Sequence, residues 1–144
     1  MSEFISICGG GGKTTLAKQY PSIFLDIDEF VWNNHDGLLD NWEKLTNENI
    51  SNIYKKIIID NKEKLKTINK VILGHHPINA EWIGIKCLAS IKPKKSIHLE
   101  NIKERNQKHK IMSINDWNNL DDAYQYKSFF DFKNYLEFIL LKKF

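Results

Sequence analysis

The sequence FISICGGGGKTTLAKQY, residues 4–20, decides the fold of this protein. Its first five residues form a mainly apolar run that predicts a short buried strand, and this run stops at four consecutive glycines. Residues 13–20 then predict a short helix, which Pro21 terminates because proline lacks the N–H that a helix interior needs. A strand, a glycine-rich turn and a helix therefore follow one another directly.

The glycine-rich turn has the composition of a phosphate-binding loop. Consecutive glycines let backbone N–H groups line a concave nest, and the helix start adds partial positive charge at the same place. Lys13 is expected to reach the β- and γ-phosphates, and the Thr14 hydroxyl to bind Mg²⁺. The residues expected around the phosphates are Gly9, Gly10, Gly11, Gly12, Lys13, Thr14 and Thr15. The alternative is a flexible glycine turn in front of an ordinary helix.

The loop departs from the strict pattern G-x-x-x-x-G-K-[ST] at one position. That pattern requires glycine at position 7, where this chain has Ile7. We therefore expect a tighter loop than usual, with Gly9 opening the turn.

The rest of the chain alternates between strand and helix patterns. Apolar residues at helical spacing predict a helix from Asn47, and its buried face comprises Ile50, Ile53, Tyr54, Ile57 and Ile58. Further strands are predicted at 22–28, 71–74 and 96–99, and further helices at 79–90, 100–110 and near the C-terminus, from residue 129. This alternation predicts one α/β domain over residues 1–144, with a mainly parallel sheet of four or five strands between helical layers.

Several segments, in this order, resemble small P-loop kinases. Leu25-Asp26-Ile27-Asp28 is similar to the D-x-D segment of the shikimate and gluconate kinases. The segment VILGHHP, residues 71–77, is similar to the third-strand exit of adenylate kinases. Residues 97–99 followed by Arg105 resemble the fourth strand and the arginine-bearing lid of the same superfamily. The resemblance implies a three-layer P-loop NTPase fold with strand order 2-3-1-4 and a lid-like segment at about 100–112.

The resemblance also implies an activity, namely transfer of the γ-phosphoryl group of ATP, with Mg²⁺, to a hydroxyl or phosphate acceptor. A nucleoside or nucleotide is the favoured acceptor, and a small metabolite or a polynucleotide 5′-hydroxyl is the competing one. Two alternatives without a kinase acceptor stay open, a nucleotide-binding regulatory module and an NTPase. Asp26 would lie near the metal, and Asp28 would face the acceptor hydroxyl as binder or general base. Both aspartates could instead form an Asx turn or helix cap.

Arg105 is the single arginine among 21 basic residues. A guanidinium grips phosphate oxygens in a bidentate way that lysine cannot copy, so Arg105 is a candidate phosphate clamp and catalytic residue. The alternative is a solvated helix in which Glu104 pairs with Lys108. His75 and His76 follow the third strand, where one of them could contact the acceptor, although turn histidines usually satisfy the backbone.

Composition excludes several classes of protein. The net charge of +3 is too small to demand nucleic acid or an anionic membrane as partner. Two cysteines without C-x-x-C spacing indicate neither a disulfide framework nor a zinc site, and no apolar stretch reaches the length of a membrane span. We therefore expect a cytoplasmic protein. The resemblance to P-loop kinases implies ATP and a small-molecule acceptor as its partners, and Trp32 follows the aspartates where an acceptor pocket would form.

Overall fold

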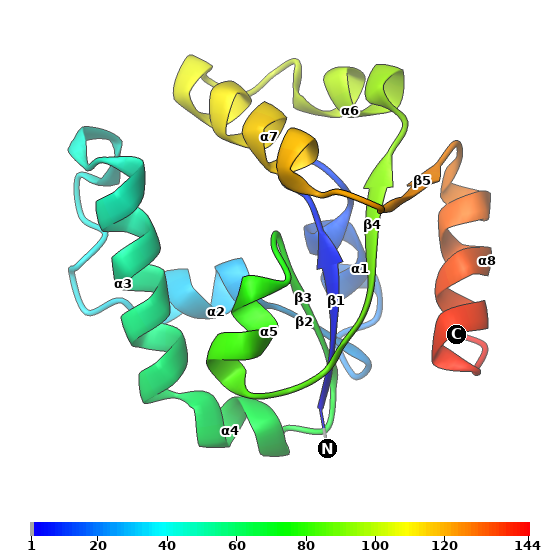
Figure 1. Ribbon diagram of the computed structural model, residues 1–144, viewed down its shortest axis with the longest axis horizontal. Coiled ribbons are helices and arrows are strands. Elements are labelled where there is room, and N and C mark those ends of the chain that lie inside the picture. Colours follow the sequence, from blue (N-terminus) through cyan, green and yellow to red (C-terminus); the bar gives the residue numbers. More distant parts are fainter. Residues whose placement is uncertain (1) are drawn as a thin grey trace.

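The computed structural model describes residues 2–144, and over this range the chain forms a five-stranded sheet with helices on both faces (Figure 1). The strand order is β2-β3-β1-β4-β5, and each of these pairings is parallel. The strands are β1 (Glu3–Ile7), β2 (Phe24–Asp26), β3 (Val71–Gly74), β4 (Cys87–Pro93) and β5 (Tyr124–Tyr126). The predicted α/β class and the parallel sheet are confirmed, and the order 2-3-1-4 is as expected, although β4 is not the segment predicted as the fourth strand.

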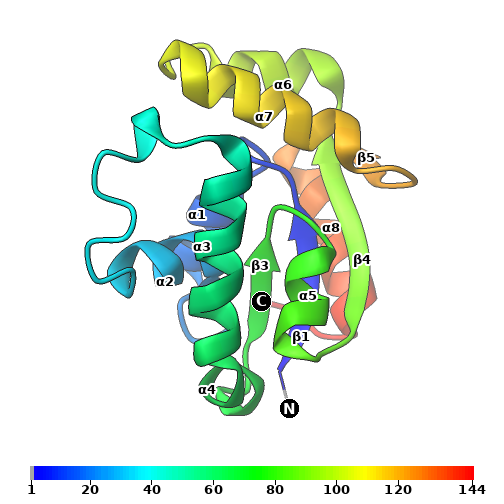
Figure 2. The same ribbon diagram turned by 60° about the vertical axis from the view of Figure 1, so that its left-hand side comes forward.

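The helices divide into three groups around this sheet. Helices α2 to α5 cover one face, α1 and α8 cover the other, and α6 and α7 lie beyond the carboxyl ends of the strands (Figures 1 and 2). Their bounds are α1 (Lys13–Gln19), α2 (Ile27–Asn33), α3 (Asn47–Asp60), α4 (Lys62–Thr67), α5 (Ile78–Ile83), α6 (Lys95–Ile102), α7 (Gln107–Asn119) and α8 (Phe129–Leu140), with a 3₁₀ turn η1 at Trp42–Lys44. Within residues 2–144 no helix combines the length and the apolar character needed to cross a bilayer.

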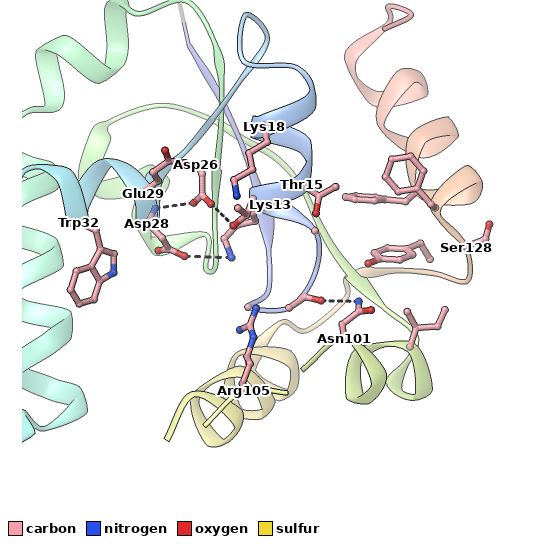
Figure 3. Close-up of a pocket in the computed structure, with 18 residues that line it drawn as sticks. Lys13, Thr15, Lys18, Asp26, Asp28, Glu29, Trp32, Asn101, Arg105 and Ser128 are labelled. Carbon is pink, nitrogen blue, oxygen red and sulfur yellow. Dashed lines mark hydrogen bonds and ion pairs between the residues drawn. The ribbon is translucent and has the colours of Figure 1, made fainter. Parts of the chain in front are cut away.

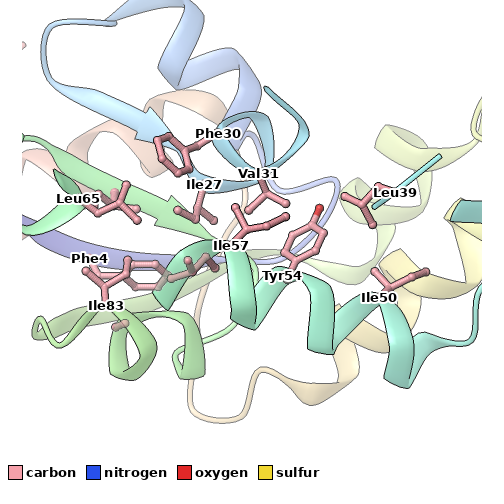
Figure 4. Packing of buried hydrophobic residues seen from close by; sticks show 13 residues of the cluster. Phe4, Ile27, Phe30, Val31, Leu39, Ile50, Tyr54, Ile57, Leu65 and Ile83 are labelled. Atoms are coloured by element: carbon pink, nitrogen blue, oxygen red, sulfur yellow. The ribbon is translucent and has the colours of Figure 1, made fainter. Parts of the chain in front are cut away.

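The core on the α3 side of the sheet follows the predicted helical face. Ile57 and Ile58 are buried against Phe4 of β1 and Ile72 of β3. Tyr54 continues this cluster toward Ile50 (Figure 4). Thr46 starts α3, since its hydroxyl accepts a hydrogen bond from the backbone N–H of Asn49. The cap and the 3.6-residue spacing explain why this helix was predictable from the sequence.

The core on the opposite face joins the first and last helices. Leu16 of α1 and Leu136 of α8 are fully buried against Ile5 and Leu73 of the central strands. Phe132 of α8 belongs to the same cluster, and its ring stacks on that of Tyr126 with centroids 4.5 Å apart. The C-terminal helix is thus built into the side of the sheet that carries α1.

The prediction for residues 79–99 was wrong. The predicted helix 79–90 ends at Ile83, because Gly84 adopts a left-handed conformation with φ of 84°. The chain then enters the sheet as β4 beside β1, and the segment 96–99, predicted as the fourth strand, lies inside α6. The pairing of β4 with β1 thus outweighed the helical pattern that the local sequence suggested for this segment.

The predicted helix 100–110 is also wrong, since it is the end of one helix and the start of another. Helix α6 ends at Ile102, and α7 begins after Asn106, whose side chain accepts a hydrogen bond from the backbone N–H of His109. The segment 100–112, predicted to be lid-like, therefore contains a turn at 103–106 with a helix on either side. Arg105 lies in this turn.

The second strand is shorter than its predicted range of 22–28. Strand β2 ends at Asp26, whose carboxylate accepts a hydrogen bond from the backbone N–H of Asp28 and so caps α2. Asp28 consequently lies in the first turn of a helix and not on the strand. The capping alternative for Asp26 is thus present in the structure, together with the contacts described below.

Two neighbouring isoleucines of α3 test the packing of the core. Ile58 is fully buried and Ile59 is 38% exposed. Ile58→Ala should lower the free energy of unfolding by about 2–5 kcal/mol, since it leaves a cavity in a well-packed cluster. The matched control Ile59→Ala should change it by less than about 1 kcal/mol. Urea unfolding followed by circular dichroism measures both values, and equal losses would contradict this description of the core.

Candidate active site

The glycine-rich loop begins directly after β1 and is shaped by a tight turn. The backbone N–H of Gly11 donates to the carbonyl of Cys8 at 2.9 Å, and Gly10 has φ of 81°, as type II turns require at their third residue. The turn therefore opens at Cys8, one residue before the predicted position. Ile7, where the strict pattern has glycine, is buried beneath the loop, and a Cβ added to Gly11 would lie 2.5 Å from its Cγ2.

The carbonyl oxygens of the loop are held by side chains from α6 and β5. His98 Nε2 lies 2.7 Å from the carbonyl oxygen of Gly9, and Asn101 donates to that of Gly10 at 3.0 Å. The Tyr126 hydroxyl donates to the carbonyl of Gly11 at 3.1 Å. In a trans peptide the C=O and the next N–H point in opposite directions, so these contacts turn the N–H groups of the loop away from α6 and β5.

A cleft of about 920 Å³ opens beside the loop, at the carboxyl ends of the strands. Trp32 and Ser128 lie toward opposite ends of this cleft, with Lys13 between them (Figure 3). Lys13 is only 6% exposed, and Thr14 and Thr15 follow it in the first turn of α1. The structure thus brings together the loop residues and threonines that the sequence singled out.

Asp26 connects the start of α1 with the start of α2. Its Oδ2 accepts a hydrogen bond from the Thr14 hydroxyl at 3.1 Å, while its Oδ1 accepts one from the backbone N–H of Asp28 at 3.0 Å. Burial raises the pKa of this carboxyl, and the neighbouring charge of Asp28 adds to the effect. A positive charge brought close to this carboxylate would therefore be stabilising.

Asp28 lies between a lysine and a histidine. Its Oδ2 is 3.5 Å from Lys13 Nζ, and its Oδ1 is 3.5 Å from His75 Nδ1. Burial alone would raise its pKa, but Lys13 and His75 outweigh that effect and hold the pKa well below its ordinary range. For His75, burial lowers the pKa, and the contact with Asp28 more than compensates and raises it. Asp28 is consequently ionised at neutral pH.

A second cavity of about 380 Å³ adjoins the cleft between α3 and α7. Gly9, Asp28, Trp32 and Arg105 line both spaces. The carboxylate of Asp28 therefore faces the cleft that holds Lys13 and also the smaller cavity.

Arg105 reaches this junction from the turn before α7. Its Nη1 donates to the hydroxyl of Ser113 at 2.8 Å, which fixes the guanidinium at the border of the two spaces. Lys108 does not pair with Glu104, the alternative that the sequence suggested. Its Nζ donates instead to the backbone carbonyls of Trp42 and Leu45. The structure therefore places Arg105 in the candidate site.

The two histidines after β3 have different surroundings. His75 contacts Asp28 and lines the second cavity, whereas His76 Nδ1 accepts a hydrogen bond from the backbone N–H of Ile78 at 3.1 Å. His76 is therefore a turn residue that helps start α5, and His75 is the one at the site.

Sequence reasoning missed several residues of this site. Asn101, Tyr126 and Asp116 were not singled out, although they hold the loop or line the second cavity. Asp116 Oδ2 lies so near the loop that a Cβ on Gly9 would be 3.2 Å away from it. No local pattern marks these residues, since only the packing of α6, α7 and β5 against the loop brings them there.

Comparison with known proteins identifies the fold. No protein-family model matches the chain, and no curated protein sequence is detectably similar to it. Its structure is similar to that of the shikimate kinase from Acinetobacter baumannii in complex with shikimate, with a TM-score of 0.56 and 13% sequence identity. The match covers 97% of this chain and 93% of that one. The chain has the fold of a small P-loop kinase. The predicted P-loop fold is thus confirmed, and at this identity the roles of individual residues stay predictions.

Two glycines with the same backbone conformation test how tightly the loop of this P-loop kinase fold is packed. Gly10 and Gly37 have φ of 81° and 83°, so alanine at either position is strained. At Gly10 a Cβ would also lie 2.5 Å from Ile102 Cγ2, whereas at Gly37 its nearest contact is 3.3 Å away. In urea unfolding, Gly10→Ala should cost about 1–3 kcal/mol more than Gly37→Ala. Equal costs would show that α6 does not pack on the loop as described.

Proposed function

We propose that this protein is an ATP-dependent phosphotransferase that moves the γ-phosphoryl group of ATP to a hydroxyl group of a small molecule. The observation that carries the proposal is the position of Asp28, between Lys13 and the second cavity. Asp28 lines both spaces and its side chain is 30% exposed, so an acceptor hydroxyl held in the cavity can reach its carboxylate. A carboxylate at the border of a phosphate-binding cleft and a smaller cavity is the arrangement that transfer to an acceptor needs.

The cleft has groups that suit the triphosphate and the base of a nucleotide. Backbone N–H groups of the glycine loop and the ammonium group of Lys13 bind the triphosphate, aided by the helix start behind them. The end of the cleft near Ser128 has an apolar wall of Ile97, Phe129 and Phe132, which suits a nucleobase.

Thr14 at the start of α1 and Asp26 at the end of β2 fit a magnesium ion. Thr14 and Asp26 place a hydroxyl and a carboxylate oxygen 3.1 Å apart beside Lys13. Mg²⁺ prefers such hard oxygen ligands and is usually held by one or two protein groups together with phosphates and water. When bound, the ion would neutralise charge on the phosphate oxygens. Thr14 and Asp26 are the residues that would hold it.

The transfer step itself uses Asp28 and Arg105. Asp28 accepts the proton of the acceptor hydroxyl as the oxygen–phosphorus bond forms. The bond between the γ-phosphorus and the β,γ-bridging oxygen breaks, and ADP leaves with the electron pair of that bond. Lys13 and the Arg105 guanidinium stabilise the charge on the transferred group. The low pKa of Asp28 keeps it unprotonated and able to orient the hydroxyl.

The acceptor is a small hydroxyl compound, in the range from nucleosides to other metabolites. The similar solved structure is a complex of a kinase with shikimate, a small molecule that carries hydroxyl groups, which supports this class of acceptor. ADP formation measured with and without a panel of nucleosides, nucleotides, sugars and DNA ends separates the alternatives. ADP that depends on an acceptor supports a kinase, ADP without one indicates an NTPase, and binding without turnover indicates a regulatory module.

Substitution of Lys13 tests the nucleotide site. Lys13→Ala should lower acceptor-dependent ADP formation by about 10²–10³-fold or more, because the lysine contacts the transferred group. The control Lys55→Ala removes an exposed lysine from α3 and should leave the rate unchanged. Titration calorimetry with a non-hydrolysable ATP analogue provides a second readout. Full activity of Lys13→Ala, or an absence of analogue binding by the parent protein, would refute the proposal.

Substitution of Asp28 tests the acceptor side. Asp28→Asn should lower kcat by roughly two to four orders of magnitude, since it removes the group that takes the proton. The control Asp121→Asn makes the same substitution at an exposed position that lines neither space, and it should behave like the parent protein. The affinity for the ATP analogue, measured in parallel, should change far less than kcat. A large loss of affinity with unchanged kcat would instead assign Asp28 to nucleotide binding.

A further inference from the structure

The second cavity has a chemical character of its own, which bears on the acceptor. It is enclosed by α3 and α7 and completed by the ends of β3 and α5. Its lining combines aromatic side chains with uncharged polar groups and carboxylates. The residues that the argument uses are Trp32, Tyr54, Trp82, Asn115, Asp116 and Asn119. The following inference rests on the proposed function, since it takes this cavity as the acceptor site.

The cavity offers little positive charge that the proposed reaction does not use. Its lining residues within 2–144 include no lysine. Arg105 lies at the border with the cleft, where its guanidinium donates to Ser113, and His75 faces Asp28 at 3.5 Å. In the proposed reaction Arg105 also faces the phosphoryl group. His109, which also lines the cavity, stacks on Trp42, and burial lowers its pKa. With Arg105 on the phosphoryl group and His75 beside Asp28, the lining within residues 2–144 leaves no further cation for an anionic group of an acceptor.

Negative charge, by contrast, is available from Asp116. In the described part of the chain this aspartate forms no ion pair. Burial raises its pKa, which the positive charges of His75 and Lys13 and a hydrogen bond from the backbone N–H of Gly9 counteract in part. An ammonium group or a hydroxyl donor placed beside Asp116 would compensate this burial, whereas an acceptor carboxylate or phosphate would add like charge beside Asp28 and Asp116.

The remaining lining favours a polar ring without a negative charge. Trp32, Tyr54 and Trp82 offer aromatic surface for contact with a ring, and Asn115 and Asn119 add amide groups that can donate and accept hydrogen bonds. A volume of about 380 Å³ is within the range of small-molecule sites.

We infer that the acceptor is an uncharged or ammonium-bearing hydroxyl compound, and that Asp116 is the residue that discriminates against anionic acceptors. Discrimination of this kind depends on a repulsive element as much as on attraction, and a carboxylate in the lining of the site supplies it. Among the proposed acceptors, nucleosides, sugars and amino sugars satisfy this condition. Nucleotides, polynucleotide ends and carboxylic acids do not.

Charge-matched probes test this inference. The protein, saturated with a non-hydrolysable ATP analogue, is screened by ligand-observed NMR against hydroxyl compounds in neutral, ammonium and anionic classes. The set includes glucose, glucosamine and glucuronate, and also shikimate with its methyl ester. Neutral and ammonium probes should bind at least about tenfold more tightly than their anionic counterparts. Only binding that Ser51→Tyr abolishes is counted, because Ser51 lines the cavity and tyrosine would fill it.

An Asp116 variant then tests whether this residue causes the discrimination against anionic probes. Asp116→Asn should reduce the preference for non-anionic probes by about tenfold, while Asp121→Asn, an exposed control on the following loop, should leave it unchanged. Anionic probes that bind as well as the others, an unchanged preference in Asp116→Asn, or no cavity binding by any class would overturn the inference. Failure of the ATP analogue to bind in the first place would count against the proposed function instead.

Discussion

The carboxylate of Asp26 joins the starts of two helices, and the geometry of the site depends on it. One oxygen accepts the Thr14 hydroxyl at the start of α1, and the other caps α2 through the backbone N–H of Asp28. Because the cap fixes where α2 begins, it also fixes the direction in which the Asp28 side chain leaves the first turn. Lys13 and Asp28 then meet at the starts of the two helices. A single buried side chain thus sets the position of the lysine and of the second carboxylate relative to each other.

Much of the fold could be predicted because the decisive signals are local. The glycine run followed by lysine and threonine defines the loop and the start of α1, and the spacing from Ile50 to Ile58 defines α3. The wrong assignments lie between residues 79 and 110, where neighbours in space decide. Residues 87–93 form a strand because they pair with the edge of β1. Asn106 caps a new helix at a place where the sequence pattern suggested one continuous helix.

The candidate site could likewise be predicted only in part. Lys13, Thr14, Asp26 and Asp28 follow strand ends, where a parallel sheet gathers functional groups, so their meeting could be expected from topology. Asp116 belongs to the last turn of α7, a helix that lies far from the loop in sequence. Its proximity to Gly9 arises only when α7 crosses the carboxyl ends of the strands. No property of the local sequence around Asp116 distinguishes it from a surface aspartate.

The hydrogen bonds that hold the loop carbonyls also have a consequence for the order of folding. Their partners are distant in sequence: His98 and Asn101 are separated from their loop residues by 89 and 91 positions, and Tyr126 from Gly11 by 115. Contacts with such separations require closure of nearly the whole chain and form slowly compared with local ones. The glycine-rich loop is therefore synthesised before its partners and is among the last segments to acquire its native shape. Competence to bind phosphate is accordingly a property of the completed fold, because the N-terminal strand, loop and helix lack the partners that orient the loop.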